Sequence, residues 1–150
     1  TRRASLRASH TATTPLRRDD FDRDEVTRRL INTYDIGPQT ADRLIRAWGS
    51  DAFQLLQVYG RPGQARLGDT DYRMAELRWA VEKEAVATLS DLFERRLRVA
   101  HFTPAAGVHL AESAAAFVAD AMRWDADRQA YECRRYRAHV TKRFCLRYRV

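Results

Sequence analysis

The sequence predicts an all-α fold, an irregular bundle of about six helices. From Phe21 onward, apolar residues recur at the spacing of one helix face. No stretch alternates between apolar and polar residues over the length of a strand bounded by turn signals. Glycine, proline and capping residues divide the helical stretches into segments. A chain of 150 residues with 45% hydrophobic content is long enough for one domain with a single core.

The first two helices are predicted on either side of a break at Gly37-Pro38. Proline fits the first turn of a helix because the N–H groups of that turn have no partner inside the helix, so Pro38 begins the second helix. Gly49 ends it as a C-terminal cap. The apolar stripe of the first helix is Phe21, Val26, Leu30 and Tyr34, and that of the second is Ala41, Leu44, Ile45 and Trp48.

A short third helix is predicted to start at Ser50 or Asp51, either of which can cap it, and to stop at Gly60. Its buried residues are expected to be Phe53, Leu56 and Tyr59. Residues 61–68 contain one proline and two glycines, and this composition predicts a loop.

The longest helical region is predicted to begin at Asp69 or Thr70. Thr88 is expected to cap a separate segment over residues 89–97, because a threonine hydroxyl can accept from free backbone N–H groups. A connection is expected over residues 100–104.

Pro104 is predicted to open a helix that reaches Met122 or Trp124. Asp125 then caps the final helix. The apolar residues expected on that last helix are Ala126, Tyr131 and Val140.

The chain is expected to divide into a linker over residues 1–15, a helical domain over residues 16–143 and a basic tail over residues 144–150. The net charge of +7 is concentrated at the two ends. Such ends favour an anionic membrane surface, nucleic acid or an acidic partner, or are simply solvated termini. No apolar run approaches the ~18 residues that a membrane-spanning helix needs.

No pattern of chemistry-bearing residues predicts a catalytic, cofactor-binding or metal site in this chain. There is no glycine-rich dinucleotide or phosphate loop. The histidines and cysteines do not have the spacing of known metal-ligand sets. On one helix, Cys133 and Cys145 would lie ~18 Å apart along the axis, so two free thiols in a reducing compartment are expected. The histidines weighed as metal ligands are His101, His109 and His139.

Two further candidate groups are explained by helix structure. Ser90 lies in the first turn of a predicted helix, an ordinary place for serine, so Ser90, Asp91 and His101 do not predict a nucleophilic triad. Glu82 and Glu84 are two residues apart on a helix and therefore do not face each other as a carboxylate pair.

The segment from Ile36 to Leu44 resembles a helix-hairpin-helix element, in which a glycine-flanked turn offers backbone N–H groups to a phosphate. Asp35 stands where the first glycine is usual, and its carboxylate would repel phosphate. A small nucleic-acid-binding module, helped by the basic C-terminus, is therefore one alternative. The other is a plain corner between two packed helices.

Two stretches together resemble the C-terminal domain of the aerobic glycerol-3-phosphate dehydrogenase and alpha-glycerophosphate oxidase family. They are residues 72–96 and residues 122–136. The matching positions are Glu76, Val81, Glu84, Ala85, Thr88, Asp91, Phe93, Arg95, Arg96, Trp124, Asp125, Glu132 and Tyr136. Leu97 departs from the threonine that family members often have after the paired arginines. We expect these motif residues to hold helix junctions rather than to take part in catalysis.

This resemblance implies a parent enzyme that oxidises glycerol 3-phosphate to dihydroxyacetone phosphate, with FAD taking the hydride and passing electrons to a quinone. The FAD and substrate groups would lie in a flavin domain before Thr1, so this chain would be a cap without catalytic residues or a cofactor of its own. Its expected partners are the flavin domain of the same polypeptide and a second subunit in a homodimer. Nucleic acid is not expected as a partner. The expected location is cytoplasmic, at the inner face of the cytoplasmic membrane, with membrane contact only through the parent.

Overall fold

The computed structural model describes residues 21–144, and within that range it is helical without a strand. The all-α prediction is confirmed. The prediction of about six helices is too low, because the described residues form eight α-helices, one π-helix and one 3-10 helix. Two of the additional elements are short helices in segments that the sequence predicts as connections, and a third is a 3-10 segment at the start of a predicted helix.

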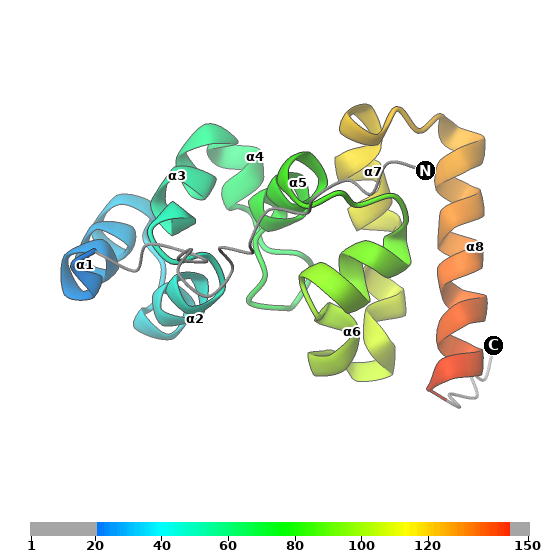
Figure 1. Ribbon diagram of the computed structural model, residues 1–150, viewed down its shortest axis with the longest axis horizontal. Coiled ribbons are helices and arrows are strands. Elements are labelled where there is room, and N and C mark those ends of the chain that lie inside the picture. The colour runs from blue at the N-terminus through cyan, green and yellow to red at the C-terminus, as the bar shows by residue number, and fades with distance from the viewer. Residues whose placement is uncertain (1–20, 145–150) are drawn as a thin grey trace, which may run out of the picture.

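Three helices follow one another at the N-terminal end of the described chain (Figure 1). They are α1 (Arg23–Tyr34), α2 (Pro38–Trp48) and α3 (Asp51–Val58). The side chain of Asp22 caps α1 by accepting from the backbone N–H of Glu25 at 3.0 Å. The break at Gly37-Pro38 and the end at Gly49 are confirmed. Helix α2 contacts both α1 and α3, and its buried residues are Thr40, Ala41, Leu44, Ile45 and Trp48.

The predicted loop over residues 61–68 instead contains a short helix, α4 (Gly60–Gln64). Gly63 is buried in it against α5, and an added Cβ would lie 3.1 Å from the Cβ of Ala75. Here glycine permits close packing, and it does not break the helix. A bridge between Arg66 and Arg73 follows, so α5 (Met74–Lys83) begins later than the predicted start at Asp69 or Thr70.

Thr88 is confirmed as the cap of the next segment, since its hydroxyl accepts from the backbone N–H of Asp91 at 3.1 Å. That segment widens into the π-helix η1 (Asp91–Arg96). The N–H of Leu97 donates to the carbonyl of Leu92, five residues earlier, at 2.9 Å. The predicted connection over residues 100–104 overlaps a short helix, α6 (Val99–Phe102).

The predicted helix from Pro104 to Met122 is wrong in its first part. Residues 104–110 form the 3-10 segment η2 (Pro104–Leu110), in which Ala105, Ala106 and Gly107 all have left-handed backbone angles. The regular helix α7 starts only at Ala111 and ends at Met122. A run of alanines favours a helix on propensity alone, but tertiary contacts hold this turn in another conformation.

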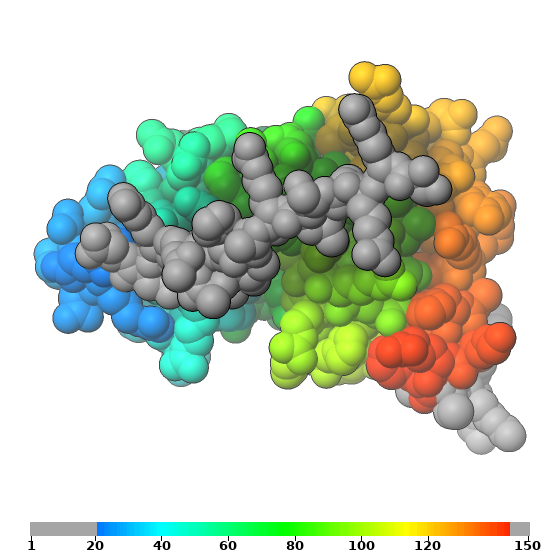
Figure 2. Space-filling view, in the orientation of Figure 1, coloured from blue at the N-terminus to red at the C-terminus, as the bar shows by residue number. Residues whose placement is uncertain are grey.

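Helix α8 (Ala126–Arg143) is the longest described helix and lies at the opposite end of the molecule from α1. Figure 2 shows the two at either end of one continuous body. The cap at Asp125 is confirmed, because its carboxylate accepts from the N–H of Arg128 at 2.8 Å. Of the predicted apolar residues only Val140 is buried, whereas Ala126 and Tyr131 are exposed. The buried face is Glu132, Cys133, Tyr136 and Val140.

The predicted linker over residues 1–15 lies outside the described residues, as does the predicted tail except for Phe144. None of the helices within residues 21–144 is long and apolar enough to cross a lipid bilayer.

Candidate functional site: an arginine-lined cavity between α2, α5 and α6

An ion pair joins α2 to α5 at the centre of the site. The guanidinium of Arg43 donates to both carboxylate oxygens of Glu76, at 2.9 and 2.6 Å. The Glu76 side chain is only 1% exposed, whereas that of Arg43 is 27% exposed. A paired geometry of this kind is the strongest form of the arginine–carboxylate interaction.

Two more donors complete the surroundings of Glu76. The indole N–H of Trp48 donates to one oxygen at 2.9 Å, and the backbone N–H of Arg73 donates to the other at 2.7 Å. Glu76 lies in the first turn of α5, and by accepting from the N–H of Arg73 it caps the start of that helix. The buried carboxylate is thus fully hydrogen-bonded and has a structural role.

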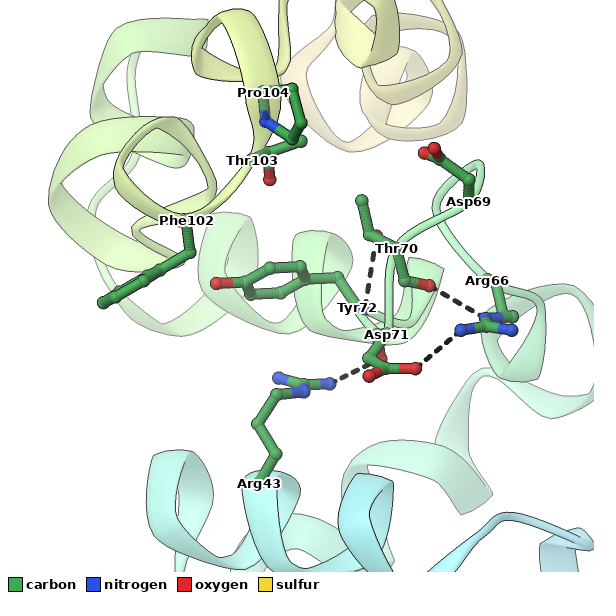
Figure 3. Close-up of a pocket in the computed structure, with 9 residues that line it drawn as sticks. All are labelled: Arg43, Arg66, Asp69, Thr70, Asp71, Tyr72, Phe102, Thr103 and Pro104. Carbon is green, nitrogen blue, oxygen red and sulfur yellow. Dashed lines mark hydrogen bonds and ion pairs between the residues drawn. The ribbon is translucent and has the colours of Figure 1, made fainter.

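A first cavity of about 570 Å³, here called the loop cavity, opens beside this pair. Figure 3 shows Arg43 reaching the carbonyl of Asp71, while the carboxylate of Asp71 faces Arg66. These contacts measure 2.8 Å and 2.6 Å. The ring of Tyr72 points across the cavity toward Phe102 (Figure 3). The full lining is Arg43, Arg66, Asp69, Thr70, Asp71, Tyr72, Phe102, Thr103 and Pro104.

A second cavity of about 620 Å³, here called the arginine cavity, adjoins the first and shares Arg43, Tyr72 and Phe102 with it. Four arginines, from α2, from the end of η1 and from the start of α6, contribute to its wall. The full lining is Arg43, Arg46, Ala47, Trp48, Tyr72, Glu76, Glu84, Arg96, Leu97, Arg98 and Phe102.

Aromatic rings lie next to the guanidinium groups in both cavities. Arg43 stacks over Tyr72 with 4.6 Å between its central carbon and the ring centroid, and Arg98 lies over Phe102 at 5.3 Å. Phe102 is 70% exposed, an unusual position for a phenylalanine. Arg98 itself has a left-handed backbone (φ 59°), which an arginine adopts only at a cost.

The chemistry of this lining suits the binding of anions. Burial raises the pKa of Tyr72 above its usual value, although the charge of Arg43 opposes the rise, so the phenol stays neutral at physiological pH. The lining of the two cavities includes neither histidine nor cysteine. Guanidinium groups beside the half-buried ring of Tyr72 and the exposed ring of Phe102 form a surface for anions that carry an apolar part.

The structure places the histidines and cysteines weighed from sequence at separate sites. His109 lies 3.4 Å from Asp69, His139 contacts Glu94, and the ring of His101 packs against Phe144. Cys133 is buried, and burial raises the pKa of its thiol, whereas Cys145 lies outside the described residues. In the range 21–144 these side chains form no group that could hold a metal ion.

The candidate triad and the carboxylate pair are also dispersed. Asp91 accepts from Thr88 and forms an ion pair with Arg95 at 3.1 Å, so it belongs to a helix cap. Glu82 accepts from Tyr59 at 2.8 Å and from Arg78 at 2.7 Å, while Glu84 lines the arginine cavity.

At the turn between α1 and α2, Asp35 has a left-handed backbone and ends α1. Gly37 precedes α2, and an added Cβ there would meet nothing within 4 Å. The turn therefore does not need this glycine for packing. The carboxylate of Asp35 remains the main obstacle to a phosphate at this turn.

Two motif residues on α8 hold helix junctions. Glu132 is 1% exposed, forms an ion pair with Arg128 at 2.8 Å and accepts from the backbone N–H of Leu89 at 3.3 Å. The hydroxyl of Tyr136 donates to the carbonyl of Ala106 at 2.6 Å, in the left-handed turn of η2. Glu76 and Glu132 are the two charged side chains buried among the described residues, and both come from the motif positions.

Sequence reasoning did not predict the arginine cavity, because its residues come from three segments far apart in the chain. One signal could have drawn attention to Glu76. It precedes Trp79 and Ala80 by three and four residues, so a carboxylate lies on the buried face of α5 and needs a partner.

A comparison with family models matches residues 9–129 to the C-terminal domain of alpha-glycerophosphate oxidase. None of the curated proteins matches the chain, and neither does any solved structure. The match covers most of the chain, from before α1 to the first residues of α8. Enzymes of this kind are FAD-dependent oxidoreductases. The chain therefore belongs to the family of the C-terminal domain of alpha-glycerophosphate oxidase.

Proposed function

We propose that this chain is the non-catalytic C-terminal helical domain of an FAD-dependent glycerol-3-phosphate dehydrogenase. The parent enzyme oxidises glycerol 3-phosphate to dihydroxyacetone phosphate, and FAD passes the electrons to a quinone. The observation that carries this proposal is the family match over residues 9–129. The cavity chemistry is consistent with a binding role, because the lining combines guanidinium groups with the aromatic rings of Tyr72 and Phe102.

The proposed role of the domain is to cap the flavin domain of the same polypeptide, and a second subunit is a further proposed partner. The exposed aromatic rings of Phe102 and Tyr131 are compatible with a contact role, because aromatic residues are enriched where proteins meet. We place the parent in the cytoplasm, at the inner face of the cytoplasmic membrane, with membrane contact made by the parent. The sequence resemblance supports that location.

The rival is a nucleic-acid-binding module that uses the Gly37 turn and the basic C-terminus. A salt titration of binding to a short DNA duplex discriminates the two, since contacts to phosphates give a steep loss of affinity with salt. We expect weak binding that is unchanged by Gly37→Ala. A Gly37→Ala variant that loses DNA affinity, when Gly60→Ala does not, supports the rival.

The proposed function is tested by assaying purified chain 1–150 with added FAD, glycerol 3-phosphate and an electron-accepting dye. We expect no retained flavin and no substrate-dependent reduction of the dye. The product of the complete reading frame is the positive control. Turnover by the isolated chain would contradict the assignment of catalysis to another domain.

A further inference from the structure

Two arginines in the arginine cavity have no carboxylate partner among residues 21–144. The side chain of Arg96, at the end of η1, forms no ion pair or hydrogen bond with any described residue. Arg98 contacts the ring of Phe102 and lies close enough to Tyr72 to lower its pKa, but it too has no acidic partner in the described chain. Arginines that line a cavity without a counter-charge are available to an incoming anion.

The remaining charges of the cavity wall are largely balanced. Arg43 is held by Glu76, and Arg46 lies 2.7 Å from Asp42. Besides Glu76, the lining contains one other carboxylate, that of Glu84. Its negative charge offsets part of the positive charge of Arg96 and Arg98. The wall therefore keeps an excess of positive charge, and Glu84 limits the affinity for an anion.

The cavity also offers a face for an apolar group. Phe102 is largely exposed and lines both cavities together with Tyr72. A volume of about 620 Å³ is in the range of small-molecule sites, which are ~300–1,000 Å³. A ligand with a charged end and an apolar end would place one on the arginines and the other against Phe102.

We propose that the arginine cavity binds a phosphate monoester dianion with Arg96 and Arg98, and that an apolar group of the same ligand packs on Phe102. A tetrahedral dianion has enough oxygens to accept from two guanidinium groups, each of which presents paired N–H donors. The π-helix places Arg96 in the lining, whereas its neighbour Arg95 is 75% exposed and forms an ion pair with Asp91. Adjacent arginines thus have different roles, and this difference provides a matched control.

The test is a titration of the ¹⁵N-labelled chain 1–150 with phenyl phosphate, followed by NMR. Trp48 lines the arginine cavity and its indole N–H donates to Glu76 in the same wall, whereas Trp79 and Trp124 are absent from the lining of both cavities. We expect a saturable shift of the Trp48 signal with smaller changes at the other two. Saturable binding with shifts of all three signals, or no saturation, overturns the proposal.

Single substitutions test which side chains bind the phosphate group. Arg96→Gln and Arg98→Gln should each weaken binding about tenfold, as expected for losing a charge-assisted hydrogen bond. Arg95→Gln should leave affinity unchanged, and Glu84→Gln should strengthen it by removing a repulsive charge. An equal loss in the Arg95 and Arg96 variants shows binding to surface charge in general and contradicts the proposal.

The apolar part and the source of the phosphate are tested separately. Phe102→Ala should weaken phenyl phosphate and leave inorganic phosphate unaffected. A phosphomonoester can also be a lipid headgroup, so vesicles with and without phosphatidic acid form a second arm. Sedimentation with phosphatidic acid that Arg96→Gln abolishes identifies a lipid source, and soluble binding without sedimentation identifies a metabolite. None of these measurements involves FAD, so their failure leaves the proposed function standing.

Discussion

Arg43 on α2 and Glu76 on α5 lie 33 residues apart in the chain and share a two-point hydrogen bond with N–O distances of 2.9 and 2.6 Å. The pair links the N-terminal helices to the rest of the molecule and forms part of the cavity wall. Burial by itself lowers the pKa of the Arg43 guanidinium. The hydrogen bonds to Glu76 and the negative charge of Glu76 outweigh burial, so the pKa is raised. The guanidinium of Arg43 therefore remains charged over the whole physiological range.

Replacing one partner of this pair should destabilise the fold. Glu76→Ala leaves Arg43 partly buried without its counter-charge and removes the acceptor of the Trp48 indole. We expect a loss of about 3–5 kcal/mol in the free energy of unfolding, measured by urea denaturation. Glu112→Gln, at a carboxylate that is 81% exposed, is the control and should change stability by less than about 0.5 kcal/mol. A loss no larger in Glu76→Ala than in the control would contradict a structural role for the pair.

The helix caps predicted from sequence provide a second test. Thr88→Ala removes the acceptor for the N–H of Asp91, and Asp125→Ala removes the acceptor for the N–H of Arg128. Each should cost about 1 kcal/mol, and Thr88→Ser should restore most of the first loss. Thermal unfolding followed by circular dichroism measures both. If serine at position 88 is as destabilising as alanine, the hydroxyl does not act as a cap.

The same substitution, alanine to glycine, should change the free energy of unfolding in opposite directions at a left-handed residue and at a residue in a regular helix. Ala85 has φ 53° and is exposed, so Ala85→Gly relieves backbone strain and should stabilise the chain by a few tenths to about 1 kcal/mol. Ala116 is exposed in the regular helix α7, so Ala116→Gly should destabilise by about 1 kcal/mol. Chemical denaturation of the two variants checks the sign. Destabilisation in both would show that no strain is released at position 85.

Arg78 connects α5 to α7 and contributes to the pH dependence of the free energy of unfolding. It pairs with Glu82 at 2.7 Å and with Asp120 at 2.5 Å. The hydrogen bond from Arg78 is the largest cause that holds the pKa of Asp120 below its usual value. Burial opposes the shift at Glu82, but bonds from Arg78 and Tyr59 still lower its pKa.

Carboxylates with lowered pKa values contribute stability above their unfolded pKa of about 4, and that stability is lost as pH falls through the folded pKa. Arg78→Met should therefore unfold at lower urea concentration at pH 7, with the difference from the unmodified chain shrinking between pH 5 and pH 2. Because the carboxylates of Glu82 and Asp120 are 37% and 72% exposed, solvent screens both pairs and the effect at pH 7 should be small. Arg61→Gln, at an exposed arginine outside these pairs, controls for net charge, and a pH-independent difference would contradict the account.

Local signals predicted much of the fold. Gly37-Pro38, Gly49, Thr88 and Asp125 mark helix ends because they act within one turn of the chain. The turn at Ala105 and Ala106 could not be predicted in this way. Alanine favours a regular helix, and the turn depends on packing and on the hydrogen bond from Tyr136, thirty residues away.

The candidate site could be predicted only in part for the same reason, because it depends on contacts between residues far apart in the chain. Glu76 and Glu132 stand among the motif positions, but nothing local shows that both are buried or names their partners. The backbone N–H of Leu89, which lies 43 residues earlier in the chain, donates to the carboxylate of Glu132. The arginine cavity needs residues from α2, η1 and α6 together, and only the tertiary structure brings these segments to one wall.

The central claim is that this chain serves as the helical domain of a larger flavin enzyme. The most direct test is to express the complete reading frame that contains residues 1–150 and measure bound FAD and glycerol-3-phosphate-dependent dye reduction. We predict a glycine-rich dinucleotide motif upstream of Thr1, flavin that copurifies with the product, and activity that the isolated chain lacks. A reading frame with no flavin-binding domain, whose product neither holds FAD nor oxidises glycerol 3-phosphate, would contradict the claim.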